Sequence, residues 1–236
     1  MSAVASCHPE ERSDEGSASL AGRKSSTRER GYALAALGMT SRAVAGELED
    51  LARRLRAVTV RIHTSGPHFD AVGAGVLWPA SDRVVVVTNA HVVPPNRGDD
   101  VSVEGANGLL VDASVMARNR DLDLALLTLG DMPDEWPTGA ALGDARALRT
   151  GEIVVALGHP FGVPGALSVG VVHLVPNGDD AWLRADIRLA PGNSGGPLAT
   201  LDGAVVGINC MIAGGLGIAI PTHVAGGFVH EALELP

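Results

Sequence analysis

A serine flanked by glycines offers the first sign of chemistry in this chain. Residues 190–198 read Ala-Pro-Gly-Asn-Ser-Gly-Gly-Pro-Leu, so Ser194 lies inside a glycine-rich turn. Gly192 and Gly195 allow the backbone to turn tightly and to approach a substrate closely. The N–H groups of such a turn can point together at a developing oxyanion. Because a serine hydroxyl is a weak nucleophile, this chemistry needs an adjacent base. Taken alone, the segment has a plain tight turn as its alternative interpretation.

Two further segments supply a candidate base and a candidate carboxylate. Four consecutive valines, residues 84–87, predict a buried strand, and His91 follows at the end of that strand. Asp123 stands at the start of a strongly apolar strand, where a carboxylate needs a hydrogen-bond partner. Asp121 is the competing carboxylate, because residues two apart in a strand point to the same side.

The order of the three side chains along the chain is informative. His91, Asp123 and Ser194 follow the order of trypsin-like double-barrel proteases, not that of subtilisins or α/β-hydrolases. In such a triad His91 takes the proton of Ser194, and Asp123 orients the imidazole and stabilises its charged form. We expect the N–H groups of Gly192 and Ser194, with that of Asn193 as an additional donor, to form the oxyanion hole.

The chain resembles the protease domain of the HtrA/Deg family of trypsin-like serine proteases over residues 41–236. The motifs that carry the resemblance are residues 88–93, 123–127, 158–162, 191–198 and 215–221. The resemblance implies a serine endopeptidase that cuts unfolded or flexible polypeptides through an acyl-enzyme intermediate, in protein quality control. It favours Asp123 over Asp121, because Asp123 meets the Leu-Ala-Leu run as the family's residue does. It also implies activity without propeptide cleavage, since Asn193 has no charge to pair with a newly cut N-terminus.

The resemblance further implies a small apolar pocket that prefers valine or alanine before the cut. The residues expected to line this pocket are Arg188, Leu189, Ala190, Ile208, Asn209 and Cys210, with Gly207 and Met211 at the ends of the second segment. Arg188 departs from the small residue usual there, so acidic residues are preferred if its head group points inward. Arginines are mostly exposed, which favours the aliphatic preference. We expect Cys210 to be a buried apolar group rather than a reactive thiol, and His159 to be a loop residue near the site.

The elements that must position these residues are mainly short strands. We predict an all-β fold of two packed six-stranded antiparallel barrels, chymotrypsin/trypsin-like, with a helix over 42–56 and a short C-terminal helix from Thr222. The predicted strands are 58–63, 72–78, 83–88, 101–103, 109–117 and 123–128, then 153–157, 167–175, 181–186, 197–200, 204–211 and 217–221. His91 and Asp123 would come from the first barrel and Ser194 from the second, so the reactive cleft would lie between the barrels.

Composition shifts divide the chain into four parts. Residues 1–40 are a polar leader that is either disordered or the product of a start assigned too early. Residues 41–129 hold the helix and the first barrel, and residues 130–151 form a linker rich in Gly, Pro, Asp and Thr. Residues 152–236 hold the second barrel and the final helix. A PDZ domain, which many family members carry, is not expected after Pro236.

Composition also bounds the partners. A formal net charge of −9 argues against general affinity for nucleic acid or anionic membranes, and no apolar run is long enough for a spanning helix. The two cysteines give no disulfide framework, and cysteine and histidine are too scattered for a zinc site, so no metal or cofactor is implied. The N-terminus shows no secretory signal, which favours the cytoplasm over the periplasm.

The partners that we expect are polypeptide substrates. The sequence does not decide whether the chain forms a homotrimer, because the aromatic-rich N-terminal contact of relatives is not evident here. The alternative to an endopeptidase is a non-catalytic scaffold that binds polypeptides in the cleft between the barrels. A third and weaker option is the hydrolysis of non-peptide esters, for which the sequence shows no dedicated pocket.

Overall fold

The computed structural model describes the backbone of residues 27–66, 69–94, 100–175 and 182–234. The chain divides into two units, Met1–Ala43 and Val44–Pro236. Helix α1 spans Thr27–Ala57 and therefore begins well before the predicted residue 42. Residues 27–40, which the sequence analysis assigned to the leader, thus lie in this helix, and their alanine and leucine content favours that conformation. The rest of that leader lies outside the described residues.

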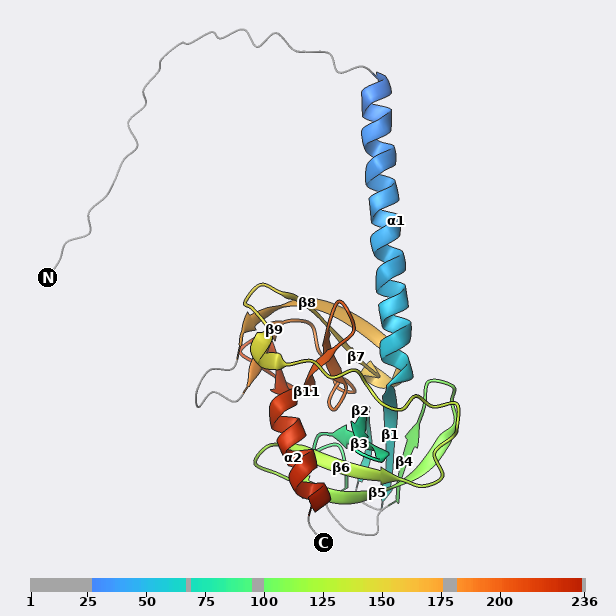
Figure 1. Ribbon diagram of the computed structural model, residues 1–236, viewed down its shortest axis with the longest axis vertical. Coiled ribbons are helices and arrows are strands. Elements are labelled where there is room, and N and C mark those ends of the chain that lie inside the picture. Colours follow the sequence, from blue (N-terminus) through green and yellow to red (C-terminus); the bar gives the residue numbers. More distant parts are fainter. Residues whose placement is uncertain (1–26, 67–68, 95–99, 176–181, 235–236) are drawn as a thin grey trace, which may run out of the picture. The chain divides into compact units, whose positions relative to one another are not determined.

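The second unit contains two closed antiparallel barrels of six strands each, which confirms the predicted fold class (Figure 1). The first barrel has the order β1-β2-β3-β6-β5-β4 and the second the order β10-β11-β12-β9-β8-β7. The first six strands are β1 (Thr59–Gly66), β2 (Phe69–Ala80), β3 (Arg83–Thr88), β4 (Asp100–Glu104), β5 (Leu110–Asn119) and β6 (Leu124–Leu129). The second six are β7 (Ile153–Gly158), β8 (Ala166–Leu174), β9 (Leu183–Asp186), β10 (Pro197–Thr200), β11 (Val205–Ala213) and β12 (Leu216–Pro221).

Central strands of the first barrel bury both of their faces. Val86 belongs to a cluster formed within that barrel, whereas its neighbours Val85 and Val87 belong to a cluster shared by both barrels. In the same way, Leu77 belongs to the cluster within the first barrel and its neighbour Trp78 to the shared cluster. Because successive side chains of a strand point to opposite faces, one face fills the barrel and the other packs at the seam between the barrels. This arrangement explains why β3 is a continuous run of valines instead of an alternating pattern.

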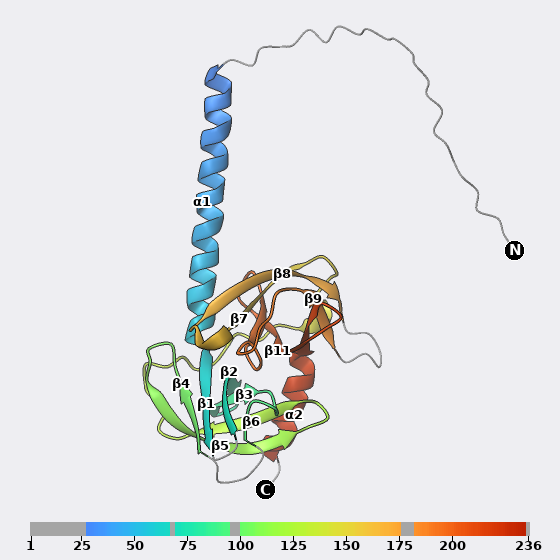
Figure 2. The same ribbon diagram turned by 180° about the vertical axis from the view of Figure 1, so that it is seen from behind.

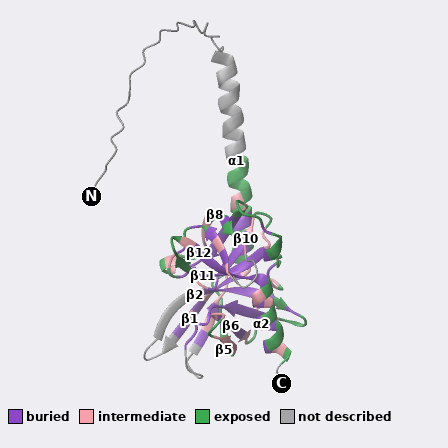
Figure 3. Cartoon of the chain, turned by 90° about the vertical axis from the view of Figure 1, so that its left-hand side faces the viewer, coloured by how far each residue is buried: buried purple, intermediate pink, exposed green. Residues whose placement is uncertain are grey.

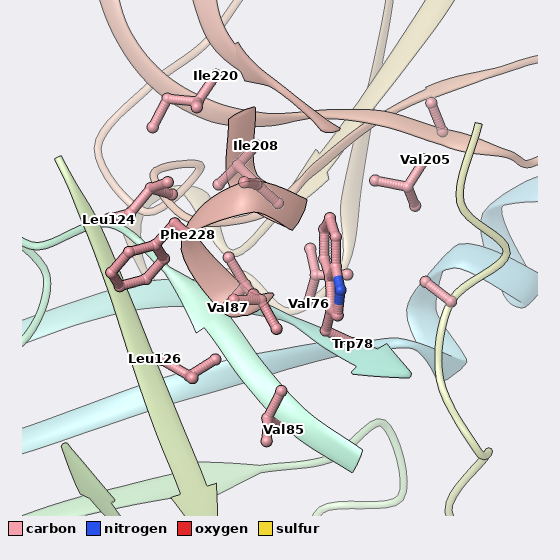
Figure 4. Packing of buried hydrophobic residues seen from close by; sticks show 14 of the residues in the cluster. Val76, Trp78, Val85, Val87, Leu124, Leu126, Val205, Ile208, Ile220 and Phe228 are labelled. Carbon is pink, nitrogen blue, oxygen red and sulfur yellow. The ribbon is translucent and has the colours of Figure 1, made fainter. Parts of the chain in front are cut away.

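The shared cluster joins the barrels to each other and to helix α2 (Thr222–Glu234). Figure 4 shows Val87 and Leu124 of the first barrel, Ile208 and Ile220 of the second, and Phe228 of α2 in this cluster. Helix α2 contacts β5 and β6 as well as β11 and β12, so it lies against both barrels (Figure 2). Figure 3 shows buried residues gathered in the strands and exposed residues along the outer side of α2.

The segment between the barrels is bonded to both of them. Ala140 donates its backbone N–H to the Leu77 carbonyl of β2 at 2.8 Å, and Gly143 donates to the Val205 carbonyl of β11 at 2.7 Å. A short 3₁₀ helix, Ala145–Ala147, follows. These bonds help to hold the barrels in one arrangement. Among the described residues, no helix combines the length and apolar character needed to cross a bilayer.

Candidate active site

The pairing of β3 with β6 brings residues 89–91 opposite Asp123. Thr88 is the partner of Ala125 at the end of the strand ladder. Just beyond it, the Ala90 N–H and the Asn89 side-chain amide both donate to the Asp123 carbonyl, at 3.1 and 3.0 Å. The loop after β3 is therefore attached to the residue that precedes β6.

The Asp123 carboxylate accepts two hydrogen bonds from His91. Its Oδ1 accepts the backbone N–H of His91 at 3.0 Å, and its Oδ2 lies 2.7 Å from His91 Nδ1. The His91 side chain is 51% exposed and that of Asp123 is 18% exposed, so solvent reaches the imidazole while the carboxylate is shielded. Asp123 has a φ of 52°, a left-handed conformation that aspartate tolerates better than most residues and that these bonds stabilise.

Asp121 takes no part in this pair. The expectation that Asp121 and Asp123 share one side of a strand is wrong, because β6 begins only at Leu124. The preceding residues form a turn, in which Asp123 N–H donates to the Arg120 carbonyl and the Asn119 side chain accepts from Asp121 N–H. Asp121 is exposed, and its carboxylate has no hydrogen bond within the described part of the chain.

Cys210 is a further partner of the carboxylate, and it comes from the second barrel. Its Sγ lies 3.1 Å from Asp123 Oδ2, to which the thiol donates. Burial opposes ionisation of Asp123, but the hydrogen bonds from His91 and Cys210 outweigh it and lower the pKa of the carboxyl. Burial, together with this carboxylate, raises the pKa of the Cys210 thiol, which therefore stays protonated.

The loop that contains Ser194 is held between the two barrels. Ser194 Oγ donates to the Cys210 carbonyl at 3.1 Å, and the Ser194 carbonyl accepts the N–H of Ala74 in β2 at 2.9 Å. Within the described residues no hydrogen bond joins Ser194 Oγ to His91 in this conformation. Gly195 has a φ of 83°, and a Cβ there would lie 2.0 Å from the Ala74 carbonyl oxygen. Only glycine fits this crossing point.

A tight turn closes the loop just before the serine. Asn193 N–H donates to the Ala190 carbonyl at 2.9 Å, and Asn193 Oδ1 accepts the Ala190 N–H at 3.0 Å. Pro191 and Gly192, with a φ of 101° at the glycine, occupy the central positions as in a type II turn. Asn193 thus closes the turn through its own backbone and side chain.

This arrangement leaves two N–H groups available beside the serine. The N–H groups of Asn193, Gly195 and Gly196 donate to carbonyls within the fold, whereas those of Gly192 and Ser194 have no acceptor in the described part of the chain. The Pro191 carbonyl accepts the Phe161 N–H at 3.0 Å. Because C=O and N–H point in opposite directions across a trans peptide, this bond directs the Gly192 N–H away from Phe161.

A cavity of about 270 Å³ opens beside Ser194. Its lining consists of Leu189, Ala190, Pro191, Asn193, Ser194, Cys210, Met211 and Ile212. Four of the predicted pocket residues, Leu189, Ala190, Cys210 and Met211, are among them, whereas Gly207 is not. Arg188 is not a lining residue and is exposed. Ile208 and Asn209 are also absent from the lining: Ile208 packs in the shared cluster, and the Asn209 amide donates to the Pro197 carbonyl.

Comparison with known proteins identifies this arrangement. The family model of the trypsin-like peptidase domain matches residues 73–208. The chain belongs to the trypsin-like peptidases. Serine protease HTRA1A of Danio rerio is 37% identical over 175 residues, which cover 70% of this chain and 36% of the relative. Periplasmic pH-dependent serine endoprotease DegQ of Escherichia coli is 31% identical over 178 residues, which cover 70% and 38%.

A solved structure agrees with these relatives. The crystal structure of the serine endoprotease from Yersinia pestis matches with a TM-score of 0.68 at 26% identity, over 78% of this chain and 65% of that one. The chain is therefore an HtrA-like trypsin-fold peptidase. It spans about a third of the length of the curated relatives it matches.

Several positioning residues of this HtrA-like peptidase escape sequence reasoning. Asn89, directly after β3, ties the His91 loop to Asp123, and its position beside the histidine is the signal that could have found it. The thiol contact of Cys210 carries no local signal, because its partner lies 87 residues away. Within the described residues no cluster of three His, Cys, Asp or Glu side chains could hold a metal ion.

Proposed function

We propose that this trypsin-like peptidase is a serine endopeptidase that uses Ser194 as nucleophile, His91 as base and Asp123 as the orienting carboxylate. The observation that carries the proposal is the hydrogen bond of 2.7 Å between His91 and Asp123, together with the N–H groups of Gly192 and Ser194, which have no acceptor among the described residues. Cys210 supports the assignment, because it contacts both the Asp123 carboxylate and the Ser194 hydroxyl.

The reaction begins when the Ser194 hydroxyl rotates from the Cys210 carbonyl toward His91. His91 holds a proton on Nδ1, which it donates to Asp123, so its Nε2 is free to take the serine proton. Ser194 Oγ then bonds to the substrate carbonyl carbon, and the oxyanion is stabilised by the N–H groups of Gly192 and Ser194. His91 returns the proton to the leaving amine, and water hydrolyses the acyl-enzyme in the same way.

The cavity beside Ser194 accounts for the substrate class. None of the described residues that line it is charged, and Leu189, Met211 and Ile212 give it an apolar wall. With Arg188 exposed outside this lining, we expect small aliphatic residues rather than acidic ones before the scissile bond. Aliphatic side chains are buried in folded proteins, so such a preference directs cleavage to unfolded or flexible chains. This is the basis for a role in protein quality control.

Labelling with a fluorophosphonate probe tests the proposal. The folded chain should react, and Ser194→Ala should not. Cleavage of a peptide library should then show valine or alanine before the cut, unchanged in Arg188→Ala because that side chain lies outside the cavity lining. A folded chain that binds unfolded polypeptide but resists labelling would instead identify a non-catalytic scaffold.

A further inference from the structure

The loop after β7, residues 159–165, packs directly against the turn of residues 190–193 that precedes Ser194. We call this turn the oxyanion turn. His159 N–H donates to the Gly192 carbonyl at 2.9 Å, and Phe161 N–H donates to the Pro191 carbonyl at 3.0 Å. A Cβ on Gly192 would lie 2.2 Å from the His159 carbonyl oxygen, so the two backbones are in close contact. The direction of the Gly192 N–H therefore depends on where residues 159–161 lie.

The His159 imidazole holds this loop in place when the ring is neutral. The residue is 7% exposed, and its Nδ1 accepts the Gly165 N–H at 3.3 Å. A nitrogen that accepts carries no proton, so the ring proton lies on Nε2. Nε2 is buried and makes no hydrogen bond of ordinary geometry among the described residues, although the backbone of Val60 lies close enough to act on the ring as a hydrogen-bonding group. The Gly165 carbonyl accepts Arg56 Nε of helix α1 at 2.8 Å, which anchors the far end of the loop.

Charged groups from the neighbouring elements face this ring. Strand β1 contributes Arg61 and His63, and strand β4 contributes Glu104. Arg56 of α1 bonds to the Gly165 carbonyl at the far end of the loop. Burial lowers the pKa of His159, and the charges of Arg61 and His63 act in the same direction. The Val60 backbone and the Glu104 carboxylate act in the opposite direction. Glu104 is itself engaged by His63 Nε2 at 2.7 Å.

We propose that His159 is a positioning residue whose neutral ring holds the oxyanion turn in place, and whose protonation releases that turn. The inference rests on the proposed function. A protonated ring carries a hydrogen on Nδ1, which then faces the Gly165 N–H, and two donors cannot bond to each other. The segment between them must shift, and this segment supplies both N–H groups that hold Pro191 and Gly192. Acid then weakens the oxyanion hole separately from its effect on the catalytic base.

Peptide binding to a His91→Ala variant separates the two histidines. The probe is a fluorescent peptide with a free C-terminal valine, whose carboxylate can occupy the oxyanion hole as a cleavage product would. Its affinity is measured by fluorescence anisotropy between about pH 8 and about pH 5, a range in which a terminal carboxylate stays ionised. We expect binding about tenfold weaker at the acid end, since hydrogen bonds to a charged group are lost.

The double variant His91→Ala/His159→Asn is the matched comparison. The asparagine carbonyl oxygen can accept from Gly165 N–H but does not titrate, so the ratio of affinities should fall to about one. The corresponding His63→Gln variant should keep the pH dependence of His91→Ala. If His159→Asn keeps it and His63→Gln removes it, the inference is overturned.

NMR of the unsubstituted chain provides a second test that needs no variant to fold. The amide signal of Gly192 should shift with the same midpoint as the His159 ring. A Gly192 amide that stays still while His159 titrates overturns the inference. That outcome leaves the proposed endopeptidase intact, because fluorophosphonate labelling near pH 8 tests it separately.

Discussion

Replacing Asp123 with asparagine tests the assignment of the triad most directly. The Asp123 oxygens accept at three points: Oδ1 from the His91 N–H, and Oδ2 from His91 Nδ1 and from the Cys210 thiol. An amide group turns one of these acceptors into a donor. If the amide nitrogen replaces Oδ2, the imidazole must accept at Nδ1 and hold its proton on Nε2, where it cannot take the serine proton. We expect kcat to fall by about 10⁴-fold, which raises the barrier by about 5 kcal/mol.

The assay is hydrolysis of a fluorogenic peptide with valine before the cut, with circular dichroism to confirm that each variant is folded. Asp121→Asn is the matched control, because its carboxylate is exposed and has no hydrogen bond within the described residues. It should keep the parent rate within about twofold, as surface changes usually do. A folded Asp123→Asn with full activity, or an inactive Asp121→Asn, would refute the reasoning.

Three further predictions concern glycine, thiol and pH. Gly195→Ala should abolish labelling by the fluorophosphonate probe, because its Cβ would lie 2.0 Å from a carbonyl oxygen. The control Gly227→Ala meets nothing within 4 Å and should stabilise the protein, through α2, by about 0.5–1 kcal/mol in urea melts. With Cys7 replaced by serine, a thiol reagent should modify Cys210 only after unfolding, since the thiol is buried and its pKa is raised; rapid reaction of the folded chain would contradict this. Because burial lowers the pKa of His159 below 6.5, the unfolded state binds the extra proton. Stability should therefore decline as pH falls through that value, less so in His159→Asn, as urea melts at several pH values can show.

The barrels are predictable from sequence because their strands are apolar runs bounded by turn residues. Strands β3 and β10 have the predicted bounds, since Arg83–Thr88 and Pro197–Thr200 end at clear changes in composition. Strand β2 is longer than predicted. Its added first residues belong to a hairpin in which Gly66 pairs with Phe69, and backbone pairing of that kind leaves little trace in composition.

The site is only partly predictable, because much of its geometry depends on contacts between distant segments. Asp123 has a left-handed conformation in the turn before β6, and the sequence pattern wrongly extends the strand to include it. The lining of the pocket likewise depends on which side of β11 faces the cavity. Met211 and Ile212 reach it, while Ile208 turns into the shared cluster.

Two hydrogen bonds connect the barrels at the candidate site, and both are weak compared with the apolar packing around them. The Ala74 N–H to Ser194 carbonyl bond and the Cys210 thiol to Asp123 bond each join one barrel to the other. A net hydrogen bond contributes only about 1 kcal/mol, and one to a charged acceptor such as the Asp123 carboxylate about 1.5–3 kcal/mol. Burial of each large apolar side chain such as Phe228 contributes about 1.5–3 kcal/mol, and the shared cluster contains many such side chains. The apolar seam therefore fixes how the barrels meet, and with it the relative position of Ser194 and His91.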